Sequence, residues 1–361
     1  YGSEVTWEKI GTFWSQDWSA PQDEVYAEVI GFDRLELLRN TEFYSSQVYE
    51  DYTLSQLAAL ILTDAGLSAS EYSIHSSLAS ITIPYAWFDR TTHRDALIEI
   101  AEAIGGTVYC DRDGLIVITP YADEATPSYT LSSDLYFTKD QPLAFSEIVN
   151  YVEVRAKPRS PGTQEVIYSD TESLVVPGAV DGVNGEAERW CIFNASDPCI
   201  DVQTATWTAT GGTITLKSQV DYSWATLLTY QNTNVEAGTV TDIEIQGKVL
   251  GTTGEKVAIA QDADSIRLNG KQALSDPIEN EFIQTKARAQ DIADAILAAY
   301  KDPRRDVVVQ ARGYTMSRLG ERMTVQSLDG SVSNDYTITR QQIEYDGGLR
   351  VEMTGQKITE A

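Results

Sequence analysis

A run of apolar residues at helical spacing marks residues 53–65 as the clearest helix of the chain. Thr53 is a good N-cap, and Gln56 completes a capping box with it. Gly66 follows as the C-terminal cap. The apolar positions that share one face of this helix are Leu54, Leu57, Ala58, Ile61, Leu62 and Ala65.

A second helical pattern runs from His93 to Ile104. Thr92 caps it, and Asp95 lies in the first turn, where the helix dipole favours a negative charge. Gly105 ends the pattern. We therefore predict a second amphipathic helix of about three turns.

Two short strand patterns, at 107–110 and 115–119, follow this helix. The Asp-Gly pair in the turn Asp111–Gly114 favours a hairpin between them. With a strand at 80–83, residues 51–121 are predicted to form a small α/β unit in the order helix, strand, helix, hairpin.

Residues 157–270 read as short strands separated by Gly, Asn and Asp, with no helical period. Thr, Val and aromatic residues dominate them, which predicts a β-sandwich-like middle domain. The strand patterns in this part of the chain are 165–169, 172–177, 204–210, 213–218, 224–232 and 240–247.

The two ends of the chain are also strand-rich. Residues 1–50 contain strand patterns at 24–32 and 42–49, and 149–156 resumes the alternation. Near the other end, 281–300 reads as a long helix that Pro303 prevents from continuing. The strands predicted after it are 306–312, 321–327, 336–345 and 349–357. The fold class predicted for these 361 residues is therefore β-rich α+β with several domains.

Charge is the one extreme of the composition, with 54 acidic against 27 basic residues. Such a surface repels nucleic acid unless a basic patch lies on it. The densest basic cluster, Lys301 with Arg304 and Arg305, is interpreted as a solvated helix end. Acidity can serve solubility, a high-salt habitat or a negatively lined channel through which DNA slides, and the sequence does not choose among these. No apolar run approaches the ~20 residues of a membrane span, and no signal peptide is visible. Because the first residue is Tyr1, we expect a fragment of a longer chain or a missing disordered start.

Motifs that carry chemistry are scarce. The sequence has two histidines, and both His75, in a polar loop, and His93, beside a helix cap, are interpreted as surface residues. No HExxH, GxSxG or paired CxxC occurs. The turn Asp111–Gly114 lacks the later ligands of a calcium loop. We therefore expect no enzyme, and no catalytic, cofactor-binding or metal-binding residues.

Three further residue groups leave alternatives open. Cys191 and Cys199 could form one bridge or remain buried thiols, and Cys110 lies in a strand. Asn194-Ala195-Ser196 matches a glycosylation acceptor, which means little without a secretory signal. Five tryptophans could line a sugar groove, although core or subunit-contact positions are more usual in strand-rich chains: Trp14, Trp18, Trp87, Trp207 and Trp224.

Three stretches of the chain resemble the tail hub proteins of tailed phages and prophages. The first is 53–74 with 81–121, where a capped helix is followed by "Tyr-x-Trp" and by a helix leading to "Asp-Arg-Asp-Gly". The second is 199–212 with 222–234 and 240–250, and the third is 279–313 with 341–358. One departure is Thr315–Arg322, where the family has "Pro-x-x-x-x-Gly-Asp" before the penultimate strand. The stretches cover well over half of the chain, in the family's order.

The resemblance implies a fold with two tail-tube-like β-barrels, one from residues 1–50 with 122–156 and one from 271–361. It implies a homotrimeric ring with six barrel-like units that joins a six-fold tube to a three-fold tip. Tube or distal tail proteins would lie above the ring and spike or fibre proteins below it. DNA would pass through the lumen without specific binding. The protein would reside in the virion tail tip, after assembly in the host cytoplasm.

Other functions stay open from the sequence. The chain could be a cell-wall-degrading tail enzyme, a module that binds a host glycan through residues 157–250, or the hub of an injection machine derived from a phage.

Overall fold

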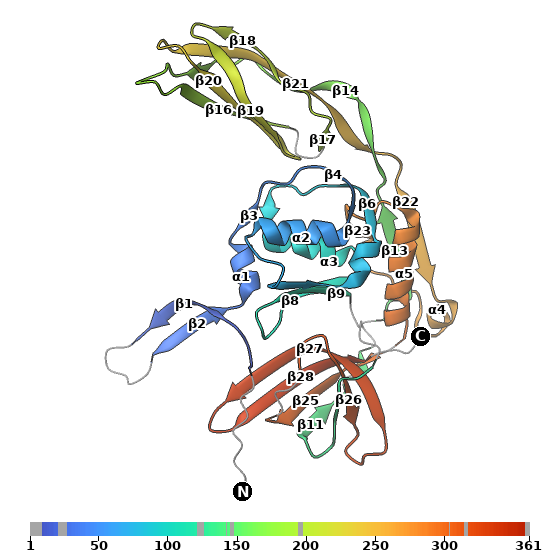
Figure 1. The fold of residues 1–361 in the computed structure, drawn as a ribbon. Helices are drawn as coiled ribbons and strands as arrows, with labels where there is room; N and C mark the ends of the chain where they lie inside the picture. Colours follow the sequence, from blue (N-terminus) through green and yellow to red (C-terminus); the bar gives the residue numbers. More distant parts are fainter. Residues whose placement is uncertain are drawn as a thin grey trace.

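The structure is a computed structural model that describes residues 9–20, 27–120, 126–141, 143–144, 148–193, 198–302, 304–313 and 317–357. The protein is β-rich and has several sheets around a small α/β unit, as the sequence predicts. In Figure 1 a β-sandwich arm stands above this unit, a two-stranded hairpin projects to one side, and a curved sheet lies below. None of the helices described is both long and apolar enough to cross a membrane.

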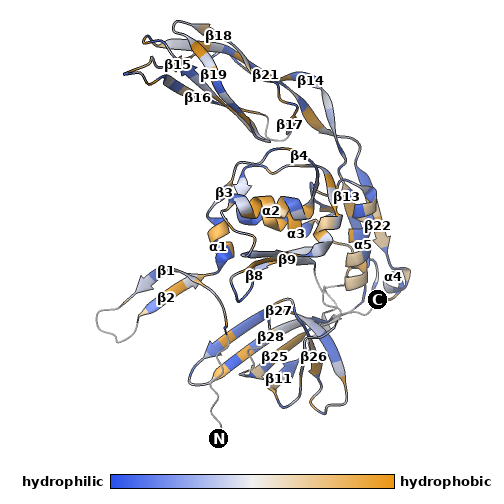
Figure 2. Ribbon diagram, viewed as in Figure 1, coloured by the Kyte–Doolittle hydropathy of each residue, from blue (hydrophilic) through white to orange (hydrophobic). Residues whose placement is uncertain are grey.

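The α/β unit is built on the two predicted helices, α2 (Leu54–Asp64) and α3 (His93–Glu102). The capping box between Thr53 and Gln56 is present. The apolar faces of both helices are buried and stand out in Figure 2. The core extends beyond the predicted limits of 51–121, because Leu38, Phe43 and Phe282 belong to it.

The predicted hairpin of this unit is also present. Strand β8 (Gly106–Cys110) pairs antiparallel with β9 (Ile116–Pro120), and β5 (Tyr72–Ile74) adds in parallel to β9. Smaller elements complete the unit: α1 (Arg34–Arg39), η1 (Ser76–Ser80), the pair β3 (Glu42–Phe43) and β7 (Thr91–Thr92), and the pair β4 (Tyr49–Thr53) and β6 (Thr82–Ala86).

The arm is a β-sandwich that spans 159–252, which is shorter than the predicted middle domain of 157–270, because residues 256–269 form a strand of another sheet and a helix. One sheet is built on the long strand β21 (Gly238–Thr252), which pairs with β14 (Arg159–Asp170), β15 (Leu174–Val176), β17 (Cys199–Ile200) and β18 (Thr206–Thr210). The other sheet has the order β16 (Gly185–Ile192), β20 (Ala225–Asn232), β19 (Ile214–Asp221). A shared core that includes Leu228, Tyr230 and Ile243 lies between them.

A three-stranded sheet connects the arm to the rest of the chain. Strand β13 (Tyr151–Ala156) is central, with β22 (Lys256–Gln261) antiparallel and β23 (Ile278–Glu279) parallel to it. Helix α5 (Lys286–Tyr300) packs on β13 and β22 through Ala289, Ile292 and Ala293. The short helix α4 (Ala263–Asn269) follows β22.

The curved sheet below the α/β unit has six strands. Its order is β10 (Tyr129–Leu131), β26 (Arg322–Gln326), β27 (Ser333–Tyr345), β28 (Leu349–Lys357), β25 (Val307–Arg312), β11 (Tyr136–Asp140). The two edge strands are consecutive in the chain, and Tyr136 Oη in β11 donates to the carbonyl oxygen of Gln326 in β26 at 2.9 Å. The sheet therefore curls around its own core in the manner of a barrel.

The strand pairing differs from the predicted division into two barrels. Strands β10 and β11, expected beside residues 1–50, join the C-terminal sheet instead. Strand β13 pairs with β22 and β23, and β1 (Trp14–Ser19) pairs with β2 (Glu28–Phe32) in a hairpin of their own. The alternation of apolar and polar residues along a strand shows which face is buried but not which strand pairs with it. These pairings between distant parts of the chain therefore could not be predicted from the sequence.

Candidate functional site

The two histidines lie in different environments. His93 was predicted at the surface, but it is 3% exposed, and this prediction was wrong. Its Nε2 lies 3.0 Å from Asp64 Oδ2, and its Nδ1 lies 2.9 Å from Thr41 Oγ1. The imidazole therefore joins the end of α2 to the start of α3. His75 caps η1 by accepting from the backbone N–H of Ser77.

The three cysteines are free thiols. Cys191 and Cys199 are buried, in agreement with the buried-thiol alternative, and burial raises the pKa of Cys191 to about 11. Cys110 is partly exposed. The possible acceptor Asn194-Ala195-Ser196 lies outside the described residues, as do the side chains of Arg304 and Arg305. Lys301 forms an ion pair of 3.3 Å with Asp262.

The five tryptophans do not line one groove. Trp87 is buried under the Arg159 guanidinium, and Trp207 packs edge-on against Tyr230 in the arm core. The other three tryptophans, Trp14, Trp18 and Trp224, lie away from these two positions. Trp14 carries Arg34 over its ring, Trp18 is 71% exposed on the β1–β2 hairpin, and Trp224 stacks with Trp190 and Tyr222.

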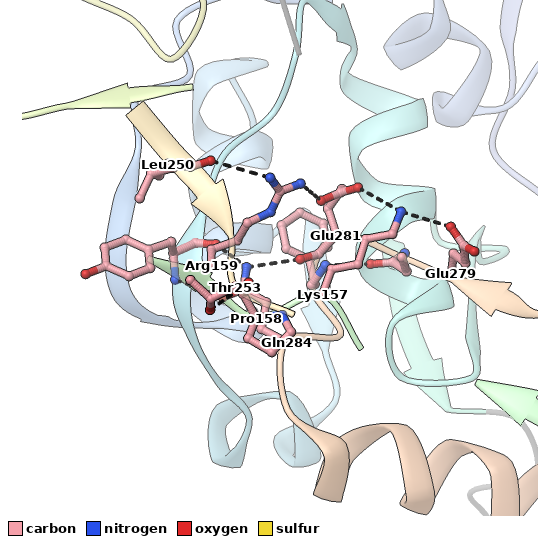
Figure 3. A network of polar contacts seen from close by, with 11 residues as sticks. Lys157, Pro158, Arg159, Leu250, Thr253, Glu279, Glu281 and Gln284 are labelled. Atoms are coloured by element: carbon pink, nitrogen blue, oxygen red, sulfur yellow. Dashed lines mark hydrogen bonds and ion pairs between the residues drawn. The ribbon is translucent and has the colours of Figure 1, made fainter. Parts of the chain in front are cut away.

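The strongest concentration of polar contacts lies where the arm meets the α/β unit (Figure 3). The Arg159 side chain is 9% exposed and pairs with Glu281 Oε2 at 2.5 Å. Lys157 Nζ reaches Glu279 at 2.9 Å and Glu281 at 3.5 Å. The hydrogen bond with Glu279 raises the pKa of Lys157, and the same bond lowers the pKa of Glu279.

Uncharged contacts reinforce this junction. Gln284 donates to the carbonyl oxygen of Tyr85 at 2.5 Å and accepts from the Tyr85 N–H at 3.2 Å. The N–H of Thr253 donates to the carbonyl oxygen of Pro158 at 2.8 Å. Phe282, which lies between Glu281 and Gln284 in the sequence, packs against Phe88 in the core of the α/β unit. These contacts tie the base of the arm to the α/β unit.

A second junction joins the α/β unit to one end of the arm's three-stranded sheet, β16-β20-β19. The N–H of Ser223 donates to the carbonyl oxygen of Ser46 at 2.7 Å, and its hydroxyl donates to that of Phe88 at 2.8 Å. The Trp224 indole N–H donates to the carbonyl oxygen of Tyr44 at 3.1 Å. The arm is thus attached at two separate places, which limits its rotation about the α/β unit.

A third junction joins the α/β unit to the six-stranded sheet through the turn Asp111–Gly114. Arg112 in this turn is 8% exposed and donates to the carbonyl oxygen of Ser317 at 2.5 Å and to Gln341 Oε1 at 2.8 Å. Asp113 forms exposed ion pairs with Lys9 and Arg318. The turn therefore is a hairpin turn, as predicted, and it also docks a second domain.

Pockets and metal-ligand clusters add little to this picture. A hollow of about 540 Å³ lies between the α/β unit and the first turn of α5, beside Phe282, Gln284 and Arg288. Within the ranges that the structure describes, no group of three or more His, Cys, Asp or Glu side chains could hold a metal ion. The site with the densest built contacts is therefore the set of three junctions, which the sequence did not indicate.

Comparison with known proteins identifies solved structures that have a similar fold. No family model and no curated protein matches the sequence. Among solved structures, the tail protein from Neisseria meningitidis MC58 is similar over 96% of this chain and 80% of its own, with a TM-score of 0.54 and 10% identity. The prophage MuSo2 43 kDa tail protein from Shewanella oneidensis is similar over 98% of this chain and 81% of its own, with a TM-score of 0.52 and 12% identity. The chain therefore shares its fold with a tail protein and a prophage tail protein, in agreement with the resemblance to tail proteins found in the sequence.

Proposed function

We propose that the protein is a structural, non-enzymatic subunit of a phage-type tail, and that it forms the hub at the tail tip. The observation that carries this proposal is the similarity of nearly the whole chain, arm included, to two tail proteins. A shared fold alone does not fix function. The sequence resemblance to tail hub proteins adds the specific role.

The three junctions support a mechanical role. They connect the arm, the α/β unit and the six-stranded sheet through buried or half-buried polar groups, among them Arg112 and Arg159. Arg112 is hydrogen-bonded to Gln341 and Arg159 to Glu281, and buried hydrogen-bonded polar groups favour one arrangement of the parts. A hub that transmits load between a tube and a tip needs such fixed arms.

The ring itself is the further part of the proposal. Three copies would close head to tail and present six barrel-like units to a six-fold tube. The net charge of −27 suits a lumen through which DNA slides without binding. The same charge would oppose assembly at low ionic strength, because like charges repel over a longer Debye length.

A glycan-binding module is the second candidate, and one observation favours it. Trp190 and Trp224 stack at 5.5 Å with an interplanar angle of 7°, and Trp190 is 41% exposed. An aromatic surface of this kind can pack against a sugar ring. Glycan arrays test this candidate: binding that Trp190→Ala abolishes, without change in the melting temperature, would support it.

Mass in solution tests the ring. Light scattering after size exclusion, at low and high salt, should give a trimer of three times 39.8 kDa, with more trimer at high salt. A dimer would contradict the proposal. Clearing of peptidoglycan by the purified chain would instead support a cell-wall-degrading enzyme.

A further inference from the structure

In the described part of the chain, the β1–β2 hairpin pairs with no other sheet, and it contacts the rest of the molecule near its base, where Arg34 lies over the Trp14 ring. It projects from the molecule as a sheet of two strands (Figure 1). Trp18 is 71% exposed on one face, and Ile30 is 48% exposed on the other. Its apolar strand β2 is visible in Figure 2. Two-stranded sheets are marginally stable in water, so a hairpin of this kind requires a surface to cover it.

One face of the hairpin carries only negative charge. Asp17 lies opposite Ile30, and Ser19 lies opposite Glu28, so Asp17, Ile30 and Glu28 share a face. We call these three residues the hairpin face. No Lys, Arg or His occurs between Lys9 and Arg34. Among the described residues, neither carboxylate has an ion-pair partner.

The six-stranded sheet offers a complementary surface. Arg312 in β25 and Arg350 in β28 are register partners, and both are exposed. The Arg312 guanidinium lies 4.6 Å from the ring centroid of Phe137, which is 58% exposed. We call Phe137, Arg312 and Arg350 the arginine face. A hollow of about 300 Å³ adjoins it, lined by Phe137 and Arg350 and also by Glu344 and Glu352.

The two arginines are poorly compensated. Like charges directly opposite on neighbouring strands destabilise a sheet. Glu344 in β27 is the other register partner of Arg350, and Glu352 lies two positions after Arg350 on the same face. The pKa of Asp134 is lowered by its hydrogen bond with Ser132 and, to a smaller extent, by Arg312. No described carboxylate lies within 4.0 Å of either guanidinium. In a chain with twice as many acidic as basic residues, such a pair is unusual.

We propose that the hairpin face of one copy docks on the arginine face of a second copy. In this contact Ile30 would cover Phe137. The carboxylates of Asp17 and Glu28 would then lie near the guanidiniums of Arg312 and Arg350. The partner is a second copy because one sequence carries both the acidic residues of the hairpin face and the exposed arginines of the arginine face. In the described part of the chain, moreover, no hydrogen bond or ion pair joins the hairpin to the six-stranded sheet of its own copy. The contact is head to tail, as ring closure requires, and in this respect it rests on the proposed hub function.

Charge exchange tests this contact in solution. One variant carries Asp17→Lys with Glu28→Lys, and another carries Arg312→Glu with Arg350→Glu. Each should weaken self-association by about tenfold or more in sedimentation equilibrium. The chain with all four changes should associate again, because the hairpin and arginine faces are again opposite in sign. The four side chains are exposed, so circular dichroism and melting temperature should stay unchanged.

Control variants place single charge reversals elsewhere. Glu188→Lys on β16 and Arg267→Glu on α4 alter exposed residues far along the chain and should leave association unchanged. The contact would be overturned if both double variants associated like the wild type, or if the variant with all four changes associated no better than either double variant. A wild-type chain that is monomeric under all conditions would also overturn it. A trimer insensitive to all four changes would retain the ring and remove this contact. A dimer or open filament that responds to the four changes would retain this contact and remove the ring.

Discussion

Arg112 Nη2 donates a 2.8 Å hydrogen bond to Gln341 Oε1, across 229 positions of the chain. The same guanidinium nitrogen donates to the carbonyl oxygen of Ser317. A turn residue of the α/β unit thereby supplies the buried charge that holds the six-stranded sheet.

Arg112→Ala should loosen this sheet. It removes a charged donor and leaves the Ser317 carbonyl oxygen and the Gln341 amide without that partner, at a cost of about 2–3 kcal/mol. Hydrogen exchange in residues 307–357 should accelerate. Arg318→Ala is the matched control, because its ion pair with Asp113 is exposed and should contribute below about 1 kcal/mol. Equal exchange in the two variants would mean that Arg112 does not hold the sheet.

Trp207→Ala should destabilise the arm. Trp207 packs at 5.4 Å against the fully buried Tyr230, so truncation leaves a cavity that costs about 3–4 kcal/mol. Urea unfolding followed by circular dichroism measures this change. Trp18→Ala, at a position 71% exposed, should change the free energy of unfolding by less than about 1 kcal/mol. A folded Trp207→Ala variant with unchanged stability would show that Trp207 is not a core residue.

Stability should fall with rising pH because of Glu99. Desolvation by the surrounding protein atoms, together with the nearby carboxylates of Asp89 and Glu102, raises the pKa of Glu99 to about 7. The unfolded chain loses this proton near pH 4.5, so the folded state is penalised as pH rises from there through about 7. Glu99→Gln should therefore raise the melting temperature at pH 8 and leave it unchanged at pH 4. Exposed Glu188→Gln is the control, and a parallel pH profile for Glu99→Gln and the wild type would refute this origin.

The local structure could be read from the sequence where short-range signals suffice. Both helices of the α/β unit, the capping box of Thr53 with Gln56 and the hairpin around Asp111–Gly114 follow from spacing and cap residues. The same holds for the arm strands and the four C-terminal strands. These elements depend on neighbours within about ten residues.

The arrangement of the elements could not be read in this way. His93 looked like a surface residue beside its cap, because only the fold brings Thr41 and Asp64 to its ring. Arg112 looked like an ordinary turn residue, because only the fold brings Ser317 and Gln341 to its guanidinium. Strands β10 and β11 pair with strands from the far end of the chain, and alternation carries no information about such partners.

Cryo-electron microscopy of tails that contain this protein tests the hub proposal most directly. We predict three copies in one ring at the tip end of the tube, with the arms outward and the β1–β2 hairpin of each copy on the arginine face of the next. Copies distributed along the tube, six copies in the ring, or a location on the fibres would contradict the proposal.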